Sequence, residues 1–185
     1  MKRFHALTFA GAGLLIAGFT LSASAQSPQI AHADLKDKSG KAVGSADLAQ
    51  TSGGVLIKLA IKDVKPGEHA VHVHAVGKCD APFESAGPHF NPGNHKHGML
   101  AGEGHAGDLP NLHVPQNGDL EVEMLAANVT LELGKPNSLL DNDGSSLVIH
   151  ATADDYKSDP DGASGERIAC GVITTASSVG RSTGK

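Results

Sequence analysis

Histidines are the residues of this chain with the clearest potential for chemistry. His72 and His74 flank Val73 in a segment that alternates from residue to residue. In a β-strand the side chains of residues two apart point to the same face, with Cα atoms about 7 Å apart. Two such imidazoles can bind one metal ion. A His-x-His pair in a strand is nevertheless weak support for a metal site when taken alone.

More histidines follow in a segment rich in glycine and proline, and Asp108 lies three residues after one of them. Several imidazoles with one carboxylate suit tetrahedral Zn²⁺, and several imidazoles suit copper. His150, at the end of another apolar run, adds a further imidazole. The alternative is a solvated histidine-rich surface tract, although the neighbouring residues are not of low complexity. The histidines of this segment are His89, His95, His97, His105 and His113.

The elements that would position these side chains have the period of β-strands. No stretch has a clear helical period, and glycine and proline are spread along the chain. Short strands separated by turn signals predict an antiparallel sandwich or barrel. Two segments lack this alternation of apolar and polar residues, Gly77–Asn117 and Asp154–Gly165. They are predicted to be long functional loops that need ligands to become ordered. The predicted strands lie near 31–35, 43–50, 55–61, 69–75, 120–125, 147–151 and 168–174.

The N-terminus has the pattern of an export signal. Lys2 and Arg3 precede the apolar stretch Ala6–Leu21, and Ala23-Ser24-Ala25 is a small-x-small cleavage pattern. An uncleaved membrane anchor is the alternative, but it would need about 20 continuous apolar residues. We therefore expect residues 1–25 to be a secretory signal peptide and residues 26–185 to form one domain.

Charge and cysteine content narrow the function further. Without Lys2 and Arg3 the formal charge changes from −5 to −7, a balance that argues against a nucleic-acid partner. The domain has few aromatic residues, and a small aliphatic core commonly needs covalent or metal cross-links. Cys79 and Cys170 are the two cysteines of the chain. They form either a disulfide, worth roughly 4.5 kcal/mol in the chain-entropy model, or two free buried thiols.

Motifs across the predicted domain resemble those of the Cu,Zn superoxide dismutase family, in the order of that family. The motif around His89 and the motif from Arg167 to Ile173 are together highly specific for this family. The resemblance implies an eight-stranded antiparallel Greek-key β-barrel or sandwich whose two long loops form the metal site. The matching motifs are Gly67-x-His69-x-x-His72-Val73-His74, Ser85-Ala86-Gly87-Pro88-His89-Phe90-Asn91-Pro92, His97-Gly98, His105-x-Gly107-Asp108-Leu109 and Arg167-x-Ala169-Cys170-Gly171-Val172-Ile173.

The resemblance implies one copper and one zinc per chain, with the ring of His89 shared between them. A ring deprotonated at both nitrogens near neutral pH needs a cation on each side. Superoxide would reduce Cu²⁺ and leave as O₂, and a second superoxide would take up the electron and protons and leave as H₂O₂. On reduction the bond from His89 to copper would break and its nitrogen would take up a proton. The implied ligands are His72, His74, His89 and His150 for copper, and His89, His97, His105 and Asp108 for zinc.

Other roles also come from the resemblance. Arg167 would attract and orient superoxide, making it and His89 the catalytic residues; the alternative is a structural ion pair with Glu166 or Asp161. Asp154 would link His72 to His97, whereas without the family match a solvated loop acid is favoured. Cys79 and Cys170 match the intrasubunit disulfide of the family. His32, His69, His95 and His113 are not assigned to a metal.

Two departures from the eukaryotic form indicate a bacterial exported protein. The segment from Cys79 to His89 is longer, and the loop before Arg167 is shorter, with Lys157 as its only base. We expect a periplasmic enzyme that defends against extracytoplasmic superoxide, although secretion into the medium is also possible. The sequence does not decide between a monomer and a homodimer. A non-catalytic metal-binding relative would be expected to lose a copper ligand or the arginine. An adhesion-type sandwich would not explain the full set of ligands.

Overall fold

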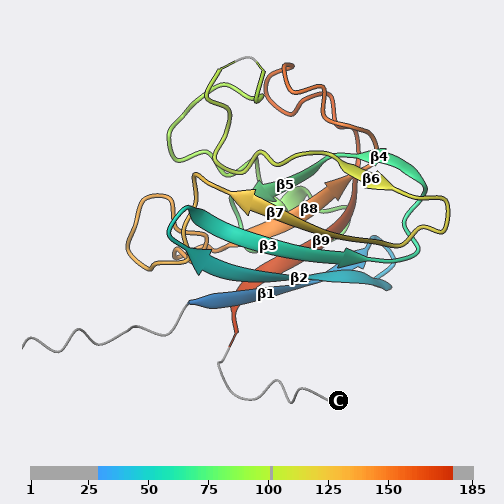
Figure 1. Cartoon of the computed structure of the whole chain (residues 1–185), viewed down its shortest axis with the longest axis horizontal. Coiled ribbons are helices and arrows are strands. Elements are labelled where there is room, and N and C mark those ends of the chain that lie inside the picture. Colours follow the sequence, from blue (N-terminus) through green and yellow to red (C-terminus); the bar gives the residue numbers. More distant parts are fainter. Residues whose placement is uncertain (1–28, 101, 177–185) are drawn as a thin grey trace, which may run out of the picture.

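The computed structural model describes residues 29–100 and 102–176. The proposed signal peptide, residues 1–25, lies outside the described residues. The described chain is almost entirely β-structure (Figure 1). None of its helical segments has the length and apolar character needed to cross a bilayer. The strands are β1 (Ile30–Asp37), β2 (Ala42–Thr51), β3 (Gly54–Ile61), β4 (Gly67–His69), β5 (Val71–His74), β6 (Leu112–Val114), β7 (Leu120–Ala126), β8 (Ser145–His150) and β9 (Arg167–Thr175), with one 3₁₀ turn, η1 (Glu84–Ala86).

Seven strands form one antiparallel sheet in the order β5-β8-β9-β1-β2-β3-β7, and β4 pairs separately with β6. Strands distant in sequence are therefore neighbours: β1 pairs with β9, β3 with β7, and β5 with β8. This arrangement confirms the predicted antiparallel all-β fold. The predicted strand at 69–75 is divided at Ala70, whose N–H donates to Thr152 O and whose carbonyl accepts from His150 N.

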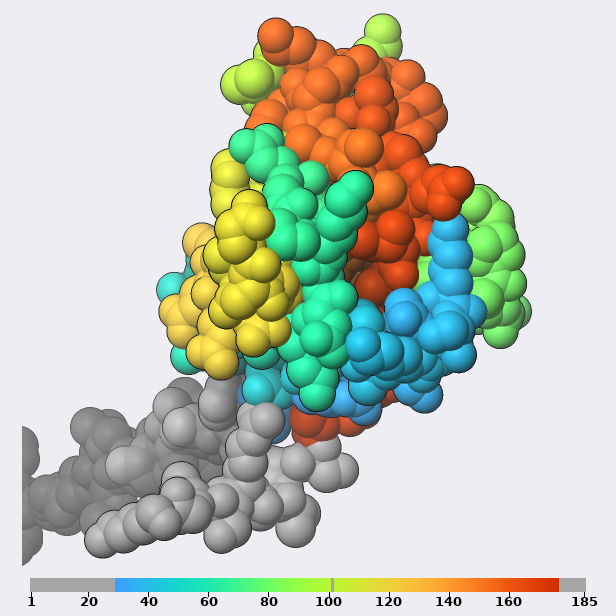
Figure 2. Space-filling model, turned by 90° about the vertical axis from the view of Figure 1, so that its right-hand side faces the viewer, coloured from blue at the N-terminus to red at the C-terminus, as the bar shows by residue number. Residues whose placement is uncertain are grey.

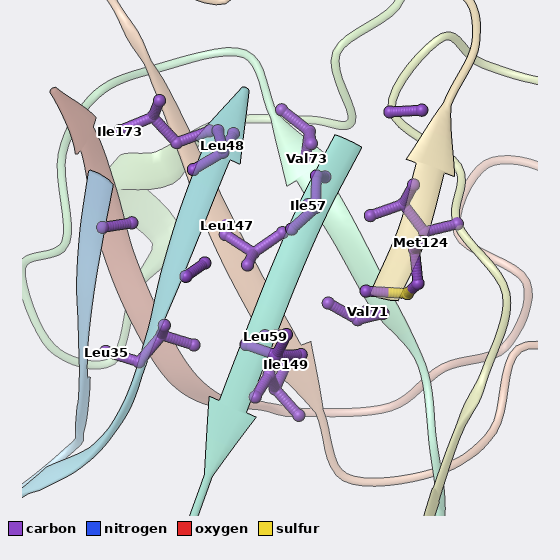
Figure 3. Packing of buried hydrophobic residues seen from close by; sticks show 14 of the residues in the cluster. Leu35, Leu48, Ile57, Leu59, Val71, Val73, Met124, Leu147, Ile149 and Ile173 are labelled. Atoms are coloured by element: carbon purple, nitrogen blue, oxygen red, sulfur yellow. The ribbon is translucent and has the colours of Figure 1, made fainter. Parts of the chain in front are cut away.

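The core follows from the period of the strands. In β3, Val55, Ile57, Leu59 and Ile61 are buried while Lys58 is exposed, as strict alternation requires. Figure 3 shows side chains from β1, β2, β3, β5, β7, β8 and β9 pointing into the same interior. The curled sheet thus encloses an aliphatic core and fixes the directions of the strand ends.

Two long loops project from one end of this sheet, after β5 and after β8 (Figure 1). Figure 2 shows the second of them, in orange, gathered at that end next to β4. The prediction that Gly77–Asn117 is all loop was wrong in one part, because Leu112 and Val114 belong to β6 and pair with β4. Both loops lie where they can cover the ends of β5 and β8.

Candidate metal centre

The strand β5 presents two histidines on the face away from the core. Val71 and Val73 pack in the core, so period two directs His72 and His74 to the opposite face, where both are fully buried. The burial comes from the long loop, which runs along β5. Phe90 N donates to Val73 O at 2.8 Å, and Val73 N donates to Gly107 O at 2.9 Å.

Close approach of this loop requires glycine at position 107. A Cβ atom there would lie 2.3 Å from Val73 O, well inside any van der Waals contact. With glycine present, isolated β-bridges join His74 to His89 and His72 to Asp108. The loop is thereby aligned with β5, and its own histidines and Asp108 are brought over the histidines of the strand.

A first cluster contains four imidazoles, His72, His74, His89 and His150, with one nitrogen from each within 4.8 Å of the others. In three of these rings, the nitrogen that points away from the centre of the cluster contacts another group of the chain. His72 Nε2 donates to Asp154 Oδ2 at 2.8 Å, His74 Nδ1 donates to Gly87 O at 2.9 Å, and His150 Nδ1 lies 3.0 Å from Ser164 Oγ. The remaining nitrogens therefore face one another, and His74 Nε2 lies 3.3 Å from His150 Nε2.

A second cluster contains three imidazoles and one carboxylate, from His89, His97, His105 and Asp108. Asp108 Oδ1 lies at its centre, 3.0 Å from His89 Nδ1, 3.1 Å from His97 Nδ1 and 3.5 Å from His105 Nδ1. Its other oxygen, Oδ2, accepts backbone N–H groups from Gly98 and His105. Burial opposes ionisation of Asp108, but these hydrogen bonds and the one from His89 outweigh it and hold its pKa well below the usual value.

His89 is common to both clusters, with a different nitrogen turned to each. Its Nδ1 is beside Asp108, whereas its Nε2 is buried and has no hydrogen-bond partner among the described residues. His72 Nδ1 is likewise buried without a hydrogen-bond partner among the described residues, and His97 Nδ1 makes no hydrogen bond there although Asp108 Oδ1 lies 3.1 Å away. An unpaired buried polar atom costs about 1–3 kcal/mol. A metal ion in each cluster would remove that cost.

The donor sets fit the two metals. Four imidazole nitrogens suit copper, and three nitrogens with one carboxylate oxygen suit zinc. Metal binding also requires unprotonated imidazoles. Burial is the largest influence on three histidines of the first cluster, lowering the pKa of His72 to about 4, of His74 to about 2 and of His150 to about 3. These rings are therefore neutral near pH 7, with lone pairs available.

Asp154 connects the two clusters through the ring nitrogens of His72 and His97 that point away from the cluster centres. Its Oδ2 accepts from His72 Nε2 at 2.8 Å and its Oδ1 from His97 Nε2 at 3.0 Å, with its side chain fully buried. Burial disfavours its charged form, but these hydrogen bonds dominate and lower its pKa to about 2. The loop can wrap this carboxylate because residue 162 is glycine, where a Cβ atom would lie 2.0 Å from Asp154 Oδ1. The structure places Asp154 in the linking position that the resemblance implied.

Arg167 lies beside the first cluster at the start of β9. It donates to Phe83 O at 2.7 Å and to Gly87 O at 2.8 Å, and the second carbonyl also accepts from His74. Its side chain is 17% exposed, so part of the guanidinium can be reached from solvent. The alternative structural ion pair with Glu166 or Asp161 is not formed among the described residues: Glu166 pairs with Lys38, and the carboxylate beside Arg167 is that of Glu84.

Sequence reasoning missed the groups that surround Arg167. Phe83 has a left-handed backbone, with φ of 81°, and is buried against the segment around Cys170. Its carbonyl is thereby turned towards Arg167. Glu84 follows, with Oε2 3.8 Å from Arg167 Nη1. The unusual length of the segment from Cys79 to His89 was the available signal.

Cys79 and Cys170 form a disulfide, with Cα atoms 5.6 Å apart. The alternative of two free thiols is therefore wrong. The bond attaches the segment that carries Phe83 and Gly87 to β9, which begins at Arg167. The arginine and its two carbonyl acceptors thus lie on segments that are covalently connected.

The histidines that were not assigned to a metal lie outside both clusters. His95 pairs with Glu103, His113 with Glu68, and His32 with Asp34 and Asp47. His69 is buried, and its nitrogens lie 2.8 Å from the carbonyl oxygens of His150 and Lys65. None of the four belongs to the two clusters of the described chain.

Comparisons with known proteins agree with this geometry. The family model described as copper/zinc superoxide dismutase matches residues 42–173. Superoxide dismutase [Cu-Zn] 1 of Aquifex aeolicus is 52% identical over 145 residues, covering 77% of this chain and 86% of that protein. Among solved structures, a SOD-like protein from Bacillus subtilis aligns with a TM-score of 0.75 at 40% identity, covering 77% of this chain and 97% of that one. Cu/Zn superoxide dismutase from Brucella abortus aligns with a TM-score of 0.64 at 28% identity, covering 78% and 99%.

Proposed function

Since this chain belongs to the copper/zinc superoxide dismutase family, it is an enzyme that disproportionates superoxide, and we propose which of its residues carry out that reaction. The first cluster, His72, His74, His89 and His150, would hold copper, and the second, His89, His97, His105 and Asp108, would hold zinc. The observation that carries the assignment is His89, whose Nδ1 faces the carboxylate of Asp108 while its buried Nε2 has no partner in the described chain.

The two ions divide the chemistry. When bound, copper supplies one-electron reduction and oxidation, and zinc, which has no redox chemistry of its own, supplies charge and fixed geometry. His89 would hold the two sites at a constant separation and offer a nitrogen that can take up and release a proton. Asp154 keeps the rings of His72 and His97 oriented through hydrogen bonds to both.

Arg167 would attract and orient the substrate. Superoxide is an anion and the domain is acidic, so a local positive charge is needed at the copper site. The guanidinium is held by two carbonyl oxygens, those of Phe83 and Gly87, and is partly exposed. These two acceptors are neutral, and the one carboxylate beside the guanidinium, that of Glu84, is 3.8 Å away and largely exposed, so part of the positive charge remains available to an incoming anion.

We further propose that the protein is exported and works in the periplasm. The disulfide between Cys79 and Cys170 supports an oxidising compartment, and the bacterial relatives support an exported form. Residues 1–25 would be removed as a signal peptide, leaving residues 26–185 as the enzyme. The expected partner is superoxide alone, without nucleic acid or membrane, in a monomer or a homodimer.

Metal analysis of protein purified from its own host tests the assignment. We expect about one copper and one zinc per chain and a copper spin-resonance spectrum with nitrogen ligands. Superoxide consumption should stop when copper is removed and return when it is restored. Full activity without copper would contradict the proposal. A chain that binds zinc and consumes no superoxide in its copper-loaded form would instead indicate a non-catalytic relative.

A further inference from the structure

We propose that Ser164 is a positioning residue for His150, and that its hydroxyl raises the donor strength of this imidazole towards copper. The inference deepens the proposed function and depends on it, because it takes His150 as a copper ligand. Ser164 lies in the loop after β8 and is fully buried. Its Oγ lies 3.0 Å from His150 Nδ1, the ring nitrogen that faces away from the first cluster.

The hydroxyl is the nearer of two oxygens at this nitrogen. Gly165 O lies 3.3 Å from His150 Nδ1, so the ring has a long backbone contact supplemented by a side chain. His72 and His74 differ, since each has an acceptor at 2.8 or 2.9 Å, a carboxylate and a carbonyl respectively. Of these three rings, only His150 therefore has a side-chain hydroxyl as the nearest oxygen to its outward-facing nitrogen.

The direction of the hydrogen bond follows from the cluster. His150 Nε2 faces the other nitrogens, so that nitrogen must carry the lone pair that binds the metal. The proton of the neutral ring is then on Nδ1, which donates to Ser164 Oγ. Accepting this proton increases the electron density of the ring and its basicity as a ligand. A more basic ligand favours the more highly charged Cu²⁺ over Cu⁺.

Backbone hydrogen bonds hold Ser164 in place. Its carbonyl accepts from Thr152 N at 3.1 Å, and its own N–H donates to Asp161 O at 3.3 Å. Thr152 is two residues beyond His150, so this hydrogen bond ties the two sides of the loop together just behind the ring. Hydrogen bonds of the chain itself thus hold the backbone that carries this hydroxyl.

Ser164→Ala tests this role, with Ser138→Ala as the matched control. Ser138 is equally buried, and its hydroxyl accepts from Leu140 N in the loop before β8. Both variants lose one buried hydroxyl, but only the first removes an acceptor from His150. With both metals loaded, we expect Ser164→Ala to have a higher copper reduction potential, an altered copper spin-resonance spectrum and about tenfold weaker Cu²⁺ binding. Ser138→Ala should match the wild type in all three measurements.

The outcomes separate this inference from the proposed function. If Ser164→Ala has the reduction potential and spectrum of the wild type, the role of Ser164 is refuted while the copper assignment stands. If the wild type itself binds no copper, the proposed function is refuted. Ser164→Cys retains a weaker acceptor of similar size and replaces the alanine variant should that fail to fold. A reduction potential above the wild-type value in Ser164→Cys supports the inference, and an unchanged one refutes it.

Discussion

Glu84 lies beside Arg167, with its carboxylate Oε2 3.8 Å from the guanidinium Nη1. The acid is 77% exposed, and its charge is close to the group that would attract superoxide. Glu166 is next to Arg167 in sequence and equally exposed, yet it pairs with Lys38. The two acids thus allow the effect of a charge at the arginine to be separated from that of a charge elsewhere on the surface.

Glu84→Gln should increase kcat/KM. Removing a negative charge near Arg167 lowers the repulsion of the anion and frees the guanidinium, and an exposed pair of this kind corresponds to about 1.5- to 5-fold. The rate constant of superoxide consumption should be compared at low and high ionic strength, because salt screens the effect. Glu166→Gln is the control and should change the rate constant less. Equal gains in the two variants would contradict a local role for Glu84.

Arg167→Ile should reduce the rate of superoxide consumption about tenfold or more while both metals stay bound, because the anion loses its local positive charge. Rate and metal content are measured on the same sample. His74 would still donate to Gly87 O, so the copper cluster keeps that support. Loss of copper or zinc would show instead that Arg167 is needed for the structure of the site.

Asp154→Asn should weaken metal binding at one of the two clusters. The carboxylate accepts from His72 with one oxygen and from His97 with the other, whereas an amide has only one oxygen acceptor. One ring therefore loses its partner, a change that typically costs about 10- to 100-fold in metal affinity. Competition with chelators of known affinity measures the change. Asp155→Asn is a neighbouring control on an exposed carboxylate, and a similar loss there would argue against a specific role for Asp154.

His105→Ala should expose the long loop to proteolysis. Its ring belongs to the second cluster, and zinc bound there would connect the loop to Asp108 and His89. Limited proteolysis of the zinc-loaded protein should cut within 77–117 faster than in the wild type. His113→Ala removes a 74% exposed imidazole from β6, within the same 77–117 segment, and should leave the pattern unchanged. An unchanged cleavage rate in His105→Ala would contradict ordering by zinc.

Acid should destabilise the metal-free protein. Burial lowers the pKa of His74 to about 2 and of His150 to about 3, so between these values and 6.5 the unfolded chain binds more protons than the folded one. The free energy of unfolding therefore falls as pH decreases below 6.5, by up to about 1.4 kcal/mol per pH unit for each group. Urea unfolding at pH 7 and pH 5 measures the change.

The half-buried His32 opposes this trend. Burial is the largest single influence on His32 and lowers its pKa, but the hydrogen bonds and charges of Asp47 and Asp34 together outweigh it and raise the pKa above its usual value. Its contribution is present at low pH and is lost as the pH rises through its raised value. His32→Gln should therefore steepen the acid destabilisation. A stability that is constant or higher at pH 5 in the metal-free wild type would contradict burial of neutral rings at the first cluster.

The alternation of apolar residues was sufficient to predict most of the strands. Val55–Ile61 shows the reason, since a period of two fixes which side chains face the core whatever the partner strand. The same rule predicts that His72 and His74 share one face of their strand. The residues of both clusters were named from the family resemblance, and the structure brings them together as two groups that share His89.

Contacts between loops depended on the tertiary structure. Phe83 O and Glu84 approach Arg167 from a segment more than eighty residues away, and Ser164 Oγ approaches His150 only because the loop after β8 folds back on itself. The period of a strand gives the direction of a side chain and no information on which carbonyl, hydroxyl or carboxylate will meet it. That pairing is decided by how loops pack across the sheet. The residues of the two clusters could therefore be named from sequence, through the family resemblance, whereas the groups that orient them and adjust their charge could not.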